Sequence, residues 1–563
     1  MTSKVPAIVI LGPGSLATAR RIQQRYPDAL IHGLSGRVEG VDRQYTEFGT
    51  TLRELYQQDT PIIALCAAGI VIRTLAPLLL EKGVEPPVLA VAEDGSAVVP
   101  LLGGLGGVNV MARDIATALQ VTPAITTSGE LRFGTCLLNP PSGYSLGDLE
   151  QGKRFVSDLL AGESVRIEGA APWLVQAQLP EDERARLAIR IDSAAGTPAA
   201  DELRIYPRNV LVALSAGASA DIGAILEQAG LAPQSLACLL AADSDMARPE
   251  LHETASALGV PLRFAATNGN LVTWLSDALG QPASLQVMGS HAIAVTEQPL
   301  DPDQIGRPRG RLAVIGLGPG AAELMVPAVR AELDRATDVL GYETYVRMAG
   351  PFRSDQVQHC TDNREEMQRA RHAFELAAQG RSVVVVSSGD PGVFAMAAAV
   401  LEALHESTDA HWHGVDLQIL PGVSASLATA AQAGAPLGHD FCVMSLSDNL
   451  KPWSIIEKRL DLAAEADLAL AFYNPISRSR PWQLGRALEI VAQHRTPHTP
   501  VVLGRDIGRP GQTLRITTLG QLTPEQVDMR TMVLIGSSTT CVFPRAEGGD
   551  WVYTPRWYGS KPL

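Results

Sequence analysis

The fold of the second half of this chain is decided by residues 311–346, which read RLAVIGLGPGAAELMVPAVRAELDRATDVLGYETYV. The apolar run 312–315 is typical of a buried strand, and it ends in the turn Gly316-Leu317-Gly318-Pro319-Gly320. An amphipathic stretch and a second apolar run, 338–342, follow. The segment therefore predicts a strand, a glycine turn, a helix and a second strand. Glycines at the carboxyl end of a parallel strand let the backbone approach a small ligand closely.

The glycine turn matches neither of two common nucleotide-binding turns. The dinucleotide pattern G-x-G-x-x-G would need glycine where Ala321 stands, and the Gly-Lys-Ser/Thr of a Walker loop does not follow. A glycine turn alone is equally typical of a tight connection. Its meaning therefore depends on the other turns of this half of the chain.

Length and composition limit the classes of protein. At 563 residues the chain is too long for one hydrophobic core, and three or four domains are expected. Hydrophobic residues make up 46% and charged residues 19%, as in an ordinary soluble globular protein. The formal net charge is −14 and no Lys/Arg-rich block occurs, so we expect no nucleic-acid partner. A polyanionic substrate fits this charge if arginines cluster locally.

The six cysteines stand singly, without a C-x-x-C pair, and no metal-ligand spacing occurs. This gives no support to a zinc ribbon or a redox pair, and scattered thiols suit a reducing cytoplasm. The N-terminal stretch lacks the layout of a signal peptide, and no apolar segment reaches the ~18 residues that a membrane span needs. We therefore expect a cytoplasmic protein with no metal and no membrane partner.

Apolar runs and turns divide the chain into α/β units. The expected parts are an α/β domain at 1–140, a connecting region at 141–205, a second α/β domain at 206–298, a linker at 299–310, and a domain at 311–563 with lobes of about 311–435 and 436–563. The connecting region differs in composition and is interpreted as having little core of its own. The linker is polar and rich in proline and glycine.

Five further turns of small residues follow apolar strands in the last domain. They are 387–392, 421–425, 473–475, 504–506 and 536–540. Ligands of open α/β sheets bind beyond the carboxyl ends of strands, so these turns could converge on one cleft. Their hydroxyls, backbone N–H groups and the carboxylate of Asp390 suit a ligand with hydroxyl or amino groups, and the lack of lysine disfavours a triphosphate. Each turn alone is also explained by turn and capping chemistry, but the series favours a site.

The series of turns resembles the tetrapyrrole methylases, which use S-adenosylmethionine (SAM) to methylate corrin precursors. The resemblance rests on Gly316-x-Gly318-Pro319-Gly320, Leu324, Ser388-Gly389-Asp390-Pro391, Pro421-Gly422-Val423-Ser424-Ala425, Tyr473-Asn474-Pro475 and Gly536-Ser537-Ser538. Other details are similar to the members that methylate precorrin-3B at carbon 17 and contract its ring to precorrin-4 in cobalamin (vitamin B12) biosynthesis. Those details are 339–342 with Tyr345, 363–366, 473–480, 504–509 and 553–558.

The resemblance covers 311–563 and implies a multidomain α/β protein. Its C-terminal part would be a two-lobed class III methyltransferase with SAM in the cleft between the lobes, and members of this family are generally homodimers. By this likeness, the cofactor-binding residues are Pro319, Gly389, Asp390, Val393, Phe394, Ser424, Ala425, Leu446, Tyr473 and Gly536. The loop at 445–448 would close over the sulfonium of SAM.

Methyl transfer needs mainly alignment of donor and acceptor, but ring contraction would profit from an acid or base. The catalytic candidates are Glu343, His439 and Asp448, and His439 is more readily interpreted as a polar turn residue. Arginine pairs well with the many carboxylates of the substrate. The substrate-binding candidates are Arg347, Arg364, Arg478, Arg480, Arg505, Arg509 and Arg515. We expect two or three of them to bind substrate and the rest to be solvated surface charges.

Residues 60–130 and 208–297 resemble the N-terminal and C-terminal parts of the cobalt-precorrin-5A hydrolase family, which implies CbiG-like α/β domains before the methylase. Two departures bear on activity: Gly103-Gly104 stands where the family has Gly-His, and Ser215-Ala216-Gly217-Ala218 stands where it has a Gly-Cys-Arg turn. The loss of a histidine and a cysteine favours a substrate-binding, channelling or structural role over lactone hydrolysis.

Three alternatives stay open at this stage. The methylase could act on the cobalt-containing substrate of the anaerobic route, fused to a working hydrolase. The chain could be a tetrapyrrole-binding carrier with an inert methylase half that hands the pigment to other enzymes of the pathway. The methylase could also act at another ring carbon, because the turns are common to the whole family.

Overall fold

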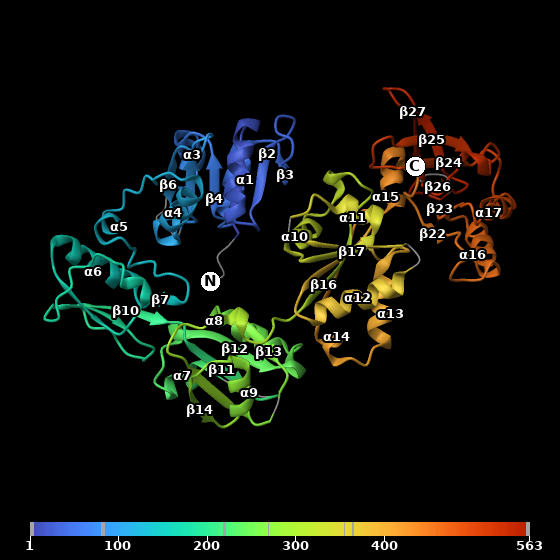
Figure 1. The fold of residues 1–563 in the computed structure, drawn as a ribbon. Coiled ribbons are helices and arrows are strands. Elements are labelled where there is room, and N and C mark those ends of the chain that lie inside the picture. The colour runs from blue at the N-terminus through green and yellow to red at the C-terminus, as the bar shows by residue number, and fades with distance from the viewer. Residues whose placement is uncertain are drawn as a thin grey trace.

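The computed structural model describes residues 5–79, 85–217, 221–267, 269–353, 355–362 and 365–558. Within these ranges the chain forms three α/β units followed by two lobes, each around its own main sheet (Figure 1). The multidomain α/β fold class expected from the sequence is confirmed. Along the same ranges, no helix is long and apolar enough to cross a membrane.

The first unit is a doubly wound sheet. Its strands, in sheet order, are β3 (Arg43–Tyr45), β2 (Leu30–Leu34), β1 (Ala7–Ile10), β4 (Ile62–Leu65), β5 (Val88–Val91) and β6 (Val98–Leu102). All pairs are parallel except β5 with β6. The helices are α1 (Leu16–Arg25), α2 (Phe48–Gln57), α3 (Ala68–Leu75) and α4 (Val108–Leu119). Helices α1 and α4 cover one face, and α2 and α3 cover the other.

The second unit corrects the expectation of a connecting region with little core. Its sheet has the order β7 (Tyr144–Leu146), β10 (Glu202–Pro207), β9 (Leu187–Ile191) and β8 (Val165–Glu168), covered by α5 (Ser128–Phe133) and α6 (Leu149–Ala161). Phe133, Phe155, Leu159 and Ile189 are buried in one apolar core between them. The strands are short and the loops between them carry charged residues, so no long apolar run marks this unit in the sequence.

The third unit has the sheet order β13 (Leu262–Ala265), β12 (Leu236–Ala242), β11 (Val210–Leu214), β15 (His291–Val295) and β14 (Ser284–Met288), with helices α7 (Ile222–Gln228), α8 (Pro249–Leu258) and α9 (Leu271–Leu279). The segment expected as a linker, 299–310, packs onto it. Leu300 and Ile305 are buried in its core, and Arg307 exchanges two backbone hydrogen bonds of 2.8 Å with Phe264 at the β13 edge. The polar residues around these two apolar ones give the segment its linker-like composition.

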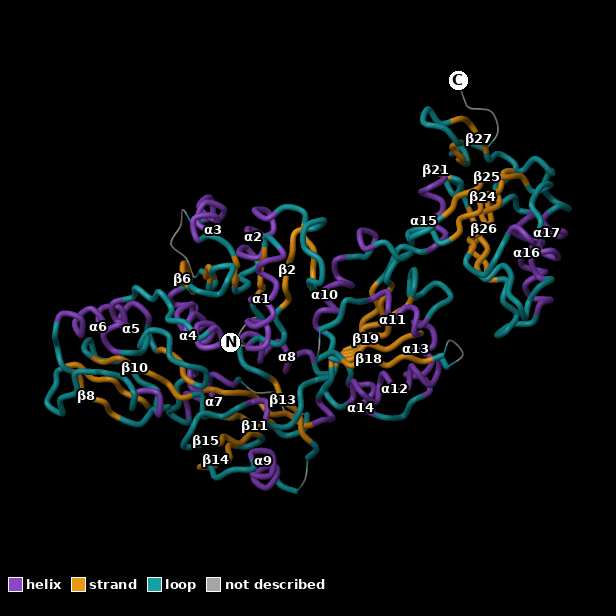
Figure 2. Tube along the Cα trace, turned by 45° about the horizontal axis from the view of Figure 1, so that its top comes forward, coloured by secondary structure: helices purple, strands orange, loops and turns teal. Residues whose placement is uncertain are grey.

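The first lobe is a fully parallel sheet. Its order is β18 (Val357–Thr361), β17 (Asp338–Tyr342), β19 (Ser382–Ser387), β16 (Arg311–Gly316) and β20 (Asp416–Leu420). The helices are α10 (Pro327–Arg335), α11 (Glu343–Ala349), α12 (Glu366–Ala378), α13 (Met396–Glu406) and α14 (Ala410–Gly414). The strand, turn, helix and strand predicted for 311–346 are confirmed as β16, α10 and β17. Figure 2 shows the strands between α10 and α11 on one side and α12 and α14 on the other.

The second lobe is a mixed sheet. Its order is β22 (Phe441–Ser445), β23 (Ala469–Tyr473), β26 (Thr531–Ile535), β24 (Pro500–Arg505) and β25 (Thr513–Thr518), with α15 (Ala425–Ala433), α16 (Trp453–Glu465) and α17 (Gln483–Val491). A small sheet of β21 (Gly434–Ala435), β28 (Asp550–Tyr553) and β27 (Cys541–Pro544) lies beside it. Ala430 and Ala433 of α15 pack into the second lobe, so that lobe begins about ten residues before the expected boundary at 435.

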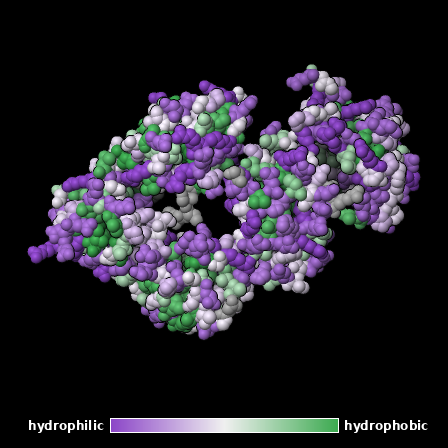
Figure 3. Space-filling model, viewed as in Figure 1, coloured by the Kyte–Doolittle hydropathy of each residue, from purple (hydrophilic) through white to green (hydrophobic). Residues whose placement is uncertain are grey.

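Figure 3 shows a central opening bounded by the first three units and the first lobe. The third unit contacts the first lobe through Arg309, whose Nε donates to the carbonyl oxygen of Gly414 at 2.8 Å, and through Arg307 beside His411. The first unit reaches α10 through an ion pair between Arg43 and Asp334.

We expect Leu159→Ala to destabilise the second unit by about 2–5 kcal/mol, because the change leaves a cavity under α6. Hydrogen exchange should show lower protection across β8, β9 and β10 together. The exposed Val175→Ala is the control and should leave exchange unchanged. Unchanged protection in Leu159→Ala would mean that residues 128–207 have no cooperative core.

A pH effect is expected in the first unit. Burial, together with the neighbouring Arg43, lowers the pKa of His32 to about 4. The unfolded chain takes up this proton near pH 6.5 and the folded chain only near pH 4, so stability falls as pH drops between these values. Exchange protection in β1 and β2 should decline over that window, and less steeply in His32→Gln. Equal slopes in the two proteins would show that His32 does not titrate as inferred.

Candidate active site

Three turns at the carboxyl edge of the first lobe pack directly against one another. Gly318 and Gly389 exchange backbone hydrogen bonds of 3.2 and 2.8 Å. A methyl group added at Gly316 would overlap the carbonyl oxygen of Gly389 and lie 2.8 Å from the amide nitrogen of Gly422. The turns after β16, β19 and β20 therefore form one surface of backbone atoms, which is possible because these positions lack a Cβ.

The carboxylate of Asp390 ties two of these turns together. Its Oδ1 accepts from the amide of Gly392 at 2.8 Å, and its Oδ2 accepts from the amide of Gly422 at 3.0 Å. Two hydrogen bonds to one ionised carboxylate are strong, and they leave further lone pairs for a ligand. Asp390 thus has a structural task in addition to the expected cofactor contact.

Residues of the second lobe complete the edge. The hydroxyl of Tyr473, at the end of β23, accepts a hydrogen bond of 3.2 Å from the amide of Ser426 in the first turn of α15. Ser424 caps the same helix, with its Oγ accepting from the amide of Leu427 at 3.4 Å. The ring of Tyr473 lies 5.4 Å from the half-exposed ring of Phe394 of the first lobe. An aromatic pair therefore bridges the two lobes.

The backbone is strained at three points of this edge. Phe394, Asn474 and Asp506 have φ values of +53°, +51° and +51°, which are unusual for residues other than glycine. Such strain is common at functional sites, where the surrounding structure holds the backbone in place.

Lys451 of the second lobe lies 5.9 Å from the centroid of the Phe394 ring. Burial lowers the pKa of Lys451, and the nearby Arg459 lowers it to a smaller extent.

Arg509 links the lobes. It stands in the turn after β24, and its Nε donates to the carbonyl oxygen of Pro319 at 3.0 Å while Nη2 donates to the hydroxyl of Ser388 at 3.0 Å. Burial raises the pKa of Tyr345, and the charge of Arg509 opposes that rise. The sequence suggested substrate binding for Arg509, whereas the structure gives it partners within the protein.

One of the expected turns does not join the others. β26 runs antiparallel to both β23 and β24, so its carboxyl end lies at the opposite edge of the sheet. Gly536 there donates from its amide to the carbonyl oxygen of Pro500, the first residue of β24, at 2.9 Å. The expectation that the turn 536–540 converges with the others is wrong, and Gly536 is removed from the candidate cofactor contacts.

Two other candidate residues, Leu446 and His439, do not present their side chains to the candidate site. Leu446 is fully buried in the second-lobe core, so only its backbone can reach a ligand. His439 precedes β22 and therefore lies at the amino end of that strand, away from Ser445 and the candidate site. It faces Asp440 at 3.6 Å, in agreement with the interpretation as a polar turn residue.

The remaining acid–base candidates differ in setting. Glu343 forms an exposed ion pair with Arg347, one turn further along α11. Asp448 follows β22 at the candidate edge, and its Oδ2 accepts from Nε2 of the buried Gln483 at 3.2 Å. Pro319, Gly389, Asp390, Val393, Phe394, Ser424, Ala425 and Tyr473 all lie in the turns of this edge or directly after them.

The arginine candidates separate into several kinds. Arg478 and Arg515 are exposed, and Arg505 forms ion pairs with Asp528 at 2.8 Å and Asp506 at 3.1 Å. Arg480 is buried. Arg364, together with Asn363, lies outside the described residues.

Sequence reasoning missed the contribution of Lys451 and Gln483. Both stand next to segments that the family motifs include, but neither belongs to a turn, and a lysine or glutamine beside a helix start carries no local signal. Only the packing of α16 and α17 brings them to the edge.

Among the described residues, no cluster of His, Cys, Asp and Glu side chains is arranged to hold a metal ion.

Residues from two motifs of the first half, 106–109 and 125–130, form a polar network around Glu130. Nδ2 of Asn109 donates to the buried Glu130 at 2.7 Å and to Thr127 at 2.9 Å, and Arg113 pairs with the other oxygen of Glu130. The network joins α4 to α5 and thereby connects the first unit to the second.

Burial raises the pKa of the Cys66 thiol to about 11, so this thiol is not a thiolate near neutral pH.

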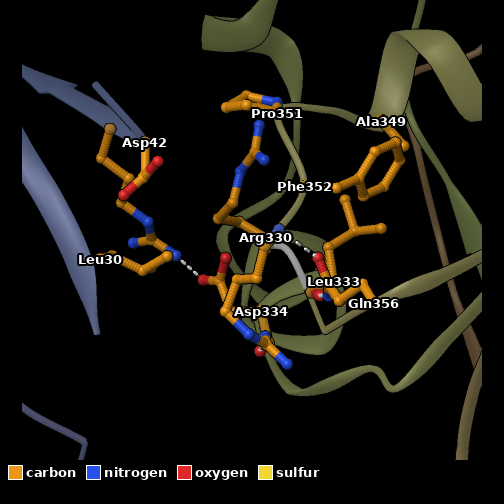
Figure 4. Close-up of a pocket in the computed structure, with 11 residues that line it drawn as sticks. Leu30, Asp42, Arg330, Leu333, Asp334, Ala349, Pro351, Phe352 and Gln356 are labelled. Carbon is orange, nitrogen blue, oxygen red and sulfur yellow. Dashed lines mark hydrogen bonds and ion pairs between the residues drawn. The ribbon is translucent and has the colours of Figure 1, made fainter. Parts of the chain in front are cut away.

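A small cavity between the first unit and α10 is not a candidate active site. Figure 4 shows it between Leu30 and Asp42 on one side and Arg330, Leu333 and Phe352 on the other. Its volume is about 20 Å³, enough for one water molecule. An adenosyl group would not fit there.

Known proteins resemble two separate parts of this chain. The family described as Tetrapyrrole (Corrin/Porphyrin) Methylases matches residues 311–523, and the one described as Cobalamin synthesis G N-terminal matches residues 50–130. The chain is 49% identical over 249 residues to a precorrin-3B C(17)-methyltransferase of Sinorhizobium sp., which covers 44% of this chain and 97% of that protein.

Other relatives align over a similar share of the chain. The cobalamin biosynthesis protein CobIJ of Mycobacterium tuberculosis is 47% identical over 44% of this chain and 48% of its own length. A probable cobalt-factor III C(17)-methyltransferase of Salmonella typhimurium is 41% identical over 44% of this chain and 99% of its own length. A crystal structure of the methyltransferase CobJ is 52% identical over 44% of this chain and all of that chain, with a TM-score of 0.41. The chain belongs to the tetrapyrrole methylase family.

Proposed function

We propose that residues 311–563 transfer a methyl group from SAM to carbon 17 of precorrin-3B, with contraction of the ring to precorrin-4, in cobalamin biosynthesis. One observation carries the proposal. The strand-end turns of both lobes meet at one edge, in a segment that aligns with nearly the whole of a precorrin-3B C(17)-methyltransferase. The identity to that protein, 49%, exceeds the 41% to the cobalt-factor III protein, which supports the metal-free substrate.

The residues of the edge fit SAM. Gly389, with φ +71°, has no side chain to block a ligand, and the half-exposed face of Phe394 suits a sulfonium cation. The free lone pairs of Asp390 can accept hydrogen bonds from ribose hydroxyls. We propose that the cofactor is held by Pro319, Gly389, Asp390, Val393, Phe394, Ser424, Ala425, Tyr473 and the backbone of Leu446.

The bound cofactor supplies a methyl group on a good leaving group, and the protein supplies position. Asp390 fixes the turns that line the site, Arg509 fixes the second lobe against them, and Tyr473 orients the start of α15. The acceptor carbon of a reduced tetrapyrrole is already nucleophilic, so methyl transfer needs alignment and exclusion of water rather than a base. For ring contraction, Asp448, oriented by Gln483, is the proposed acid or base.

The first three units are proposed to hold the pigment or to support its transfer to other enzymes of the pathway. The burial and ion pairing of Glu130 and the raised pKa of Cys66 disfavour a hydrolase that uses these groups. A homodimer through the methylase half is proposed from the family resemblance.

The function is tested with the purified chain, SAM and precorrin-3B. We expect a product that mass spectrometry shows to carry one additional methyl group and a contracted ring. Asp390→Asn should weaken SAM binding and methyl transfer by about tenfold or more, because hydrogen bonds to a charged group are worth roughly 1.5–3 kcal/mol each. Asp461→Asn is the control, a half-exposed carboxylate on α16 that pairs with His494. Pigment binding without methyl transfer by the wild-type chain would favour the carrier instead.

Arg509→Ala is expected to raise the KM for SAM by about tenfold through loss of two hydrogen bonds between the lobes. Arg509→Lys keeps the charge but not the fork of donors, so an intermediate effect is expected. Steady-state kinetics with varied SAM measure both. The exposed Arg371→Ala on α12 serves as the control. A normal KM in Arg509→Ala, with a raised KM for the tetrapyrrole, would restore the substrate-binding role suggested by the sequence.

A further inference from the structure

Five arginines of the described residues are buried, and four of them are well supplied with partners. These four are Arg204, Arg263, Arg369 and Arg495. Each has at least three hydrogen bonds or ion pairs from its guanidinium group. Arg495, for example, donates to carbonyl oxygens of Ala464 and Leu468 and pairs with Asp467 at 3.1 Å. This is the usual state of a buried charge, because an unpaired one is costly.

Arg480 is the exception. Its side chain is 8% exposed, and its guanidinium makes one hydrogen bond within the described residues, from Nη1 to the carbonyl oxygen of Asn474 at 3.2 Å. Nε is buried without a partner, and neither Nη2 nor Nε has a carboxylate within ion-pair distance in that part of the chain. These two N–H groups form the edge of a guanidinium that binds a carboxylate through two parallel hydrogen bonds.

The surroundings of Arg480 belong to the candidate site. Asn474, which accepts its one hydrogen bond, follows Tyr473 directly and is held at φ +51°. Three residues after Arg480, the amide oxygen of Gln483 is also buried without a partner, while its nitrogen donates to Asp448. Unsatisfied buried groups of this kind call for an explanation. Here two of them lie in one short segment after β23.

We propose that Arg480 is a carboxylate anchor of the active site, whose Nε and Nη2 bind one carboxylate of a bound molecule. The inference rests on the proposed function, which supplies two sources of that carboxylate: an acidic side chain of the tetrapyrrole, or the amino-acid part of the cofactor. Both offer the same chemistry to the guanidinium. The exposed and ion-paired arginines of the same lobe lack a free donor edge in a desolvated setting.

The test measures binding by calorimetry on the full chain, without turnover. The probes are uroporphyrin III, a stable tetrapyrrole with eight carboxylates, S-adenosylhomocysteine, and 5′-methylthioadenosine, which lacks the amino-acid carboxylate. Arg480→Gln should weaken one carboxylate probe by about tenfold or more. Weaker uroporphyrin binding assigns the anchor to the tetrapyrrole. Weaker S-adenosylhomocysteine binding, with unchanged methylthioadenosine binding, assigns it to the cofactor.

Two further variants separate this role from a structural one. Arg480→Gln should keep or raise the melting temperature, because it removes a buried charge with few partners, whereas Arg495→Gln should lower it. Lys458→Gln, an exposed charge on α16, controls for net charge. Unchanged affinity for all three probes in Arg480→Gln overturns the inference, and so does a melting temperature that falls as in Arg495→Gln without a binding change. A wild-type chain that binds these probes but transfers no methyl group would instead count against the proposed function.

Discussion

The candidate site depends on backbone atoms of three turns meeting without side chains between them. Gly316 and Gly422 both lie against the carbonyl oxygen of Gly389, and a Cβ at either position would overlap it. This contact joins the ends of β16, β19 and β20 into one surface. Asp390 accepts hydrogen bonds from the amides of Gly392 and Gly422, which would otherwise lack a partner within the turns. Because the three strands are neighbours in a parallel sheet, the surface is as stable as the sheet itself. The second lobe then needs only a few contacts, through Tyr473 and Arg509, to complete the site.

Strand direction decides which turns of the second lobe can contribute. β22, β23 and β24 end at the same edge, and β26 ends at the other. The turn after β24 therefore reaches Pro319, while Gly536 lies beside the start of β24. Small residues after an apolar run look the same in either case, so the sequence predicts the turns but not the edge at which each one lies. For the same reason the sequence did not exclude His439 from the site. It precedes β22, and only the structure shows that the start of this strand lies away from the site.

Local patterns predicted most of the methylase half and the alternation of strands and helices before it. They failed where burial is provided by few and scattered residues. In the second unit the apolar residues of β8, β9 and β10 are separated by polar loops, and Leu159 and Phe155 come from a helix with many charges. In 299–310 only Leu300 and Ile305 contribute buried apolar side chains. In both segments, packing against a neighbouring element supplies the fold, and that information is not local.

Glu130 of the first half and Arg480 of the second half are buried charged groups with opposite surroundings. Glu130 of the first half is buried, and each of its oxygens has a hydrogen-bond or ion-pair partner within the protein, so its charge is compensated without a ligand. Arg480 of the second half has a buried Nε without a partner, and its one guanidinium hydrogen bond among the described residues is from Nη1. The paired Glu130 network contributes to joining two units, whereas an unpaired buried donor is a cost that binding removes. The motifs that the first half shares with its relatives are thus compatible with a structural role, while the burial of Arg480 is best explained by a ligand that brings the missing negative charge.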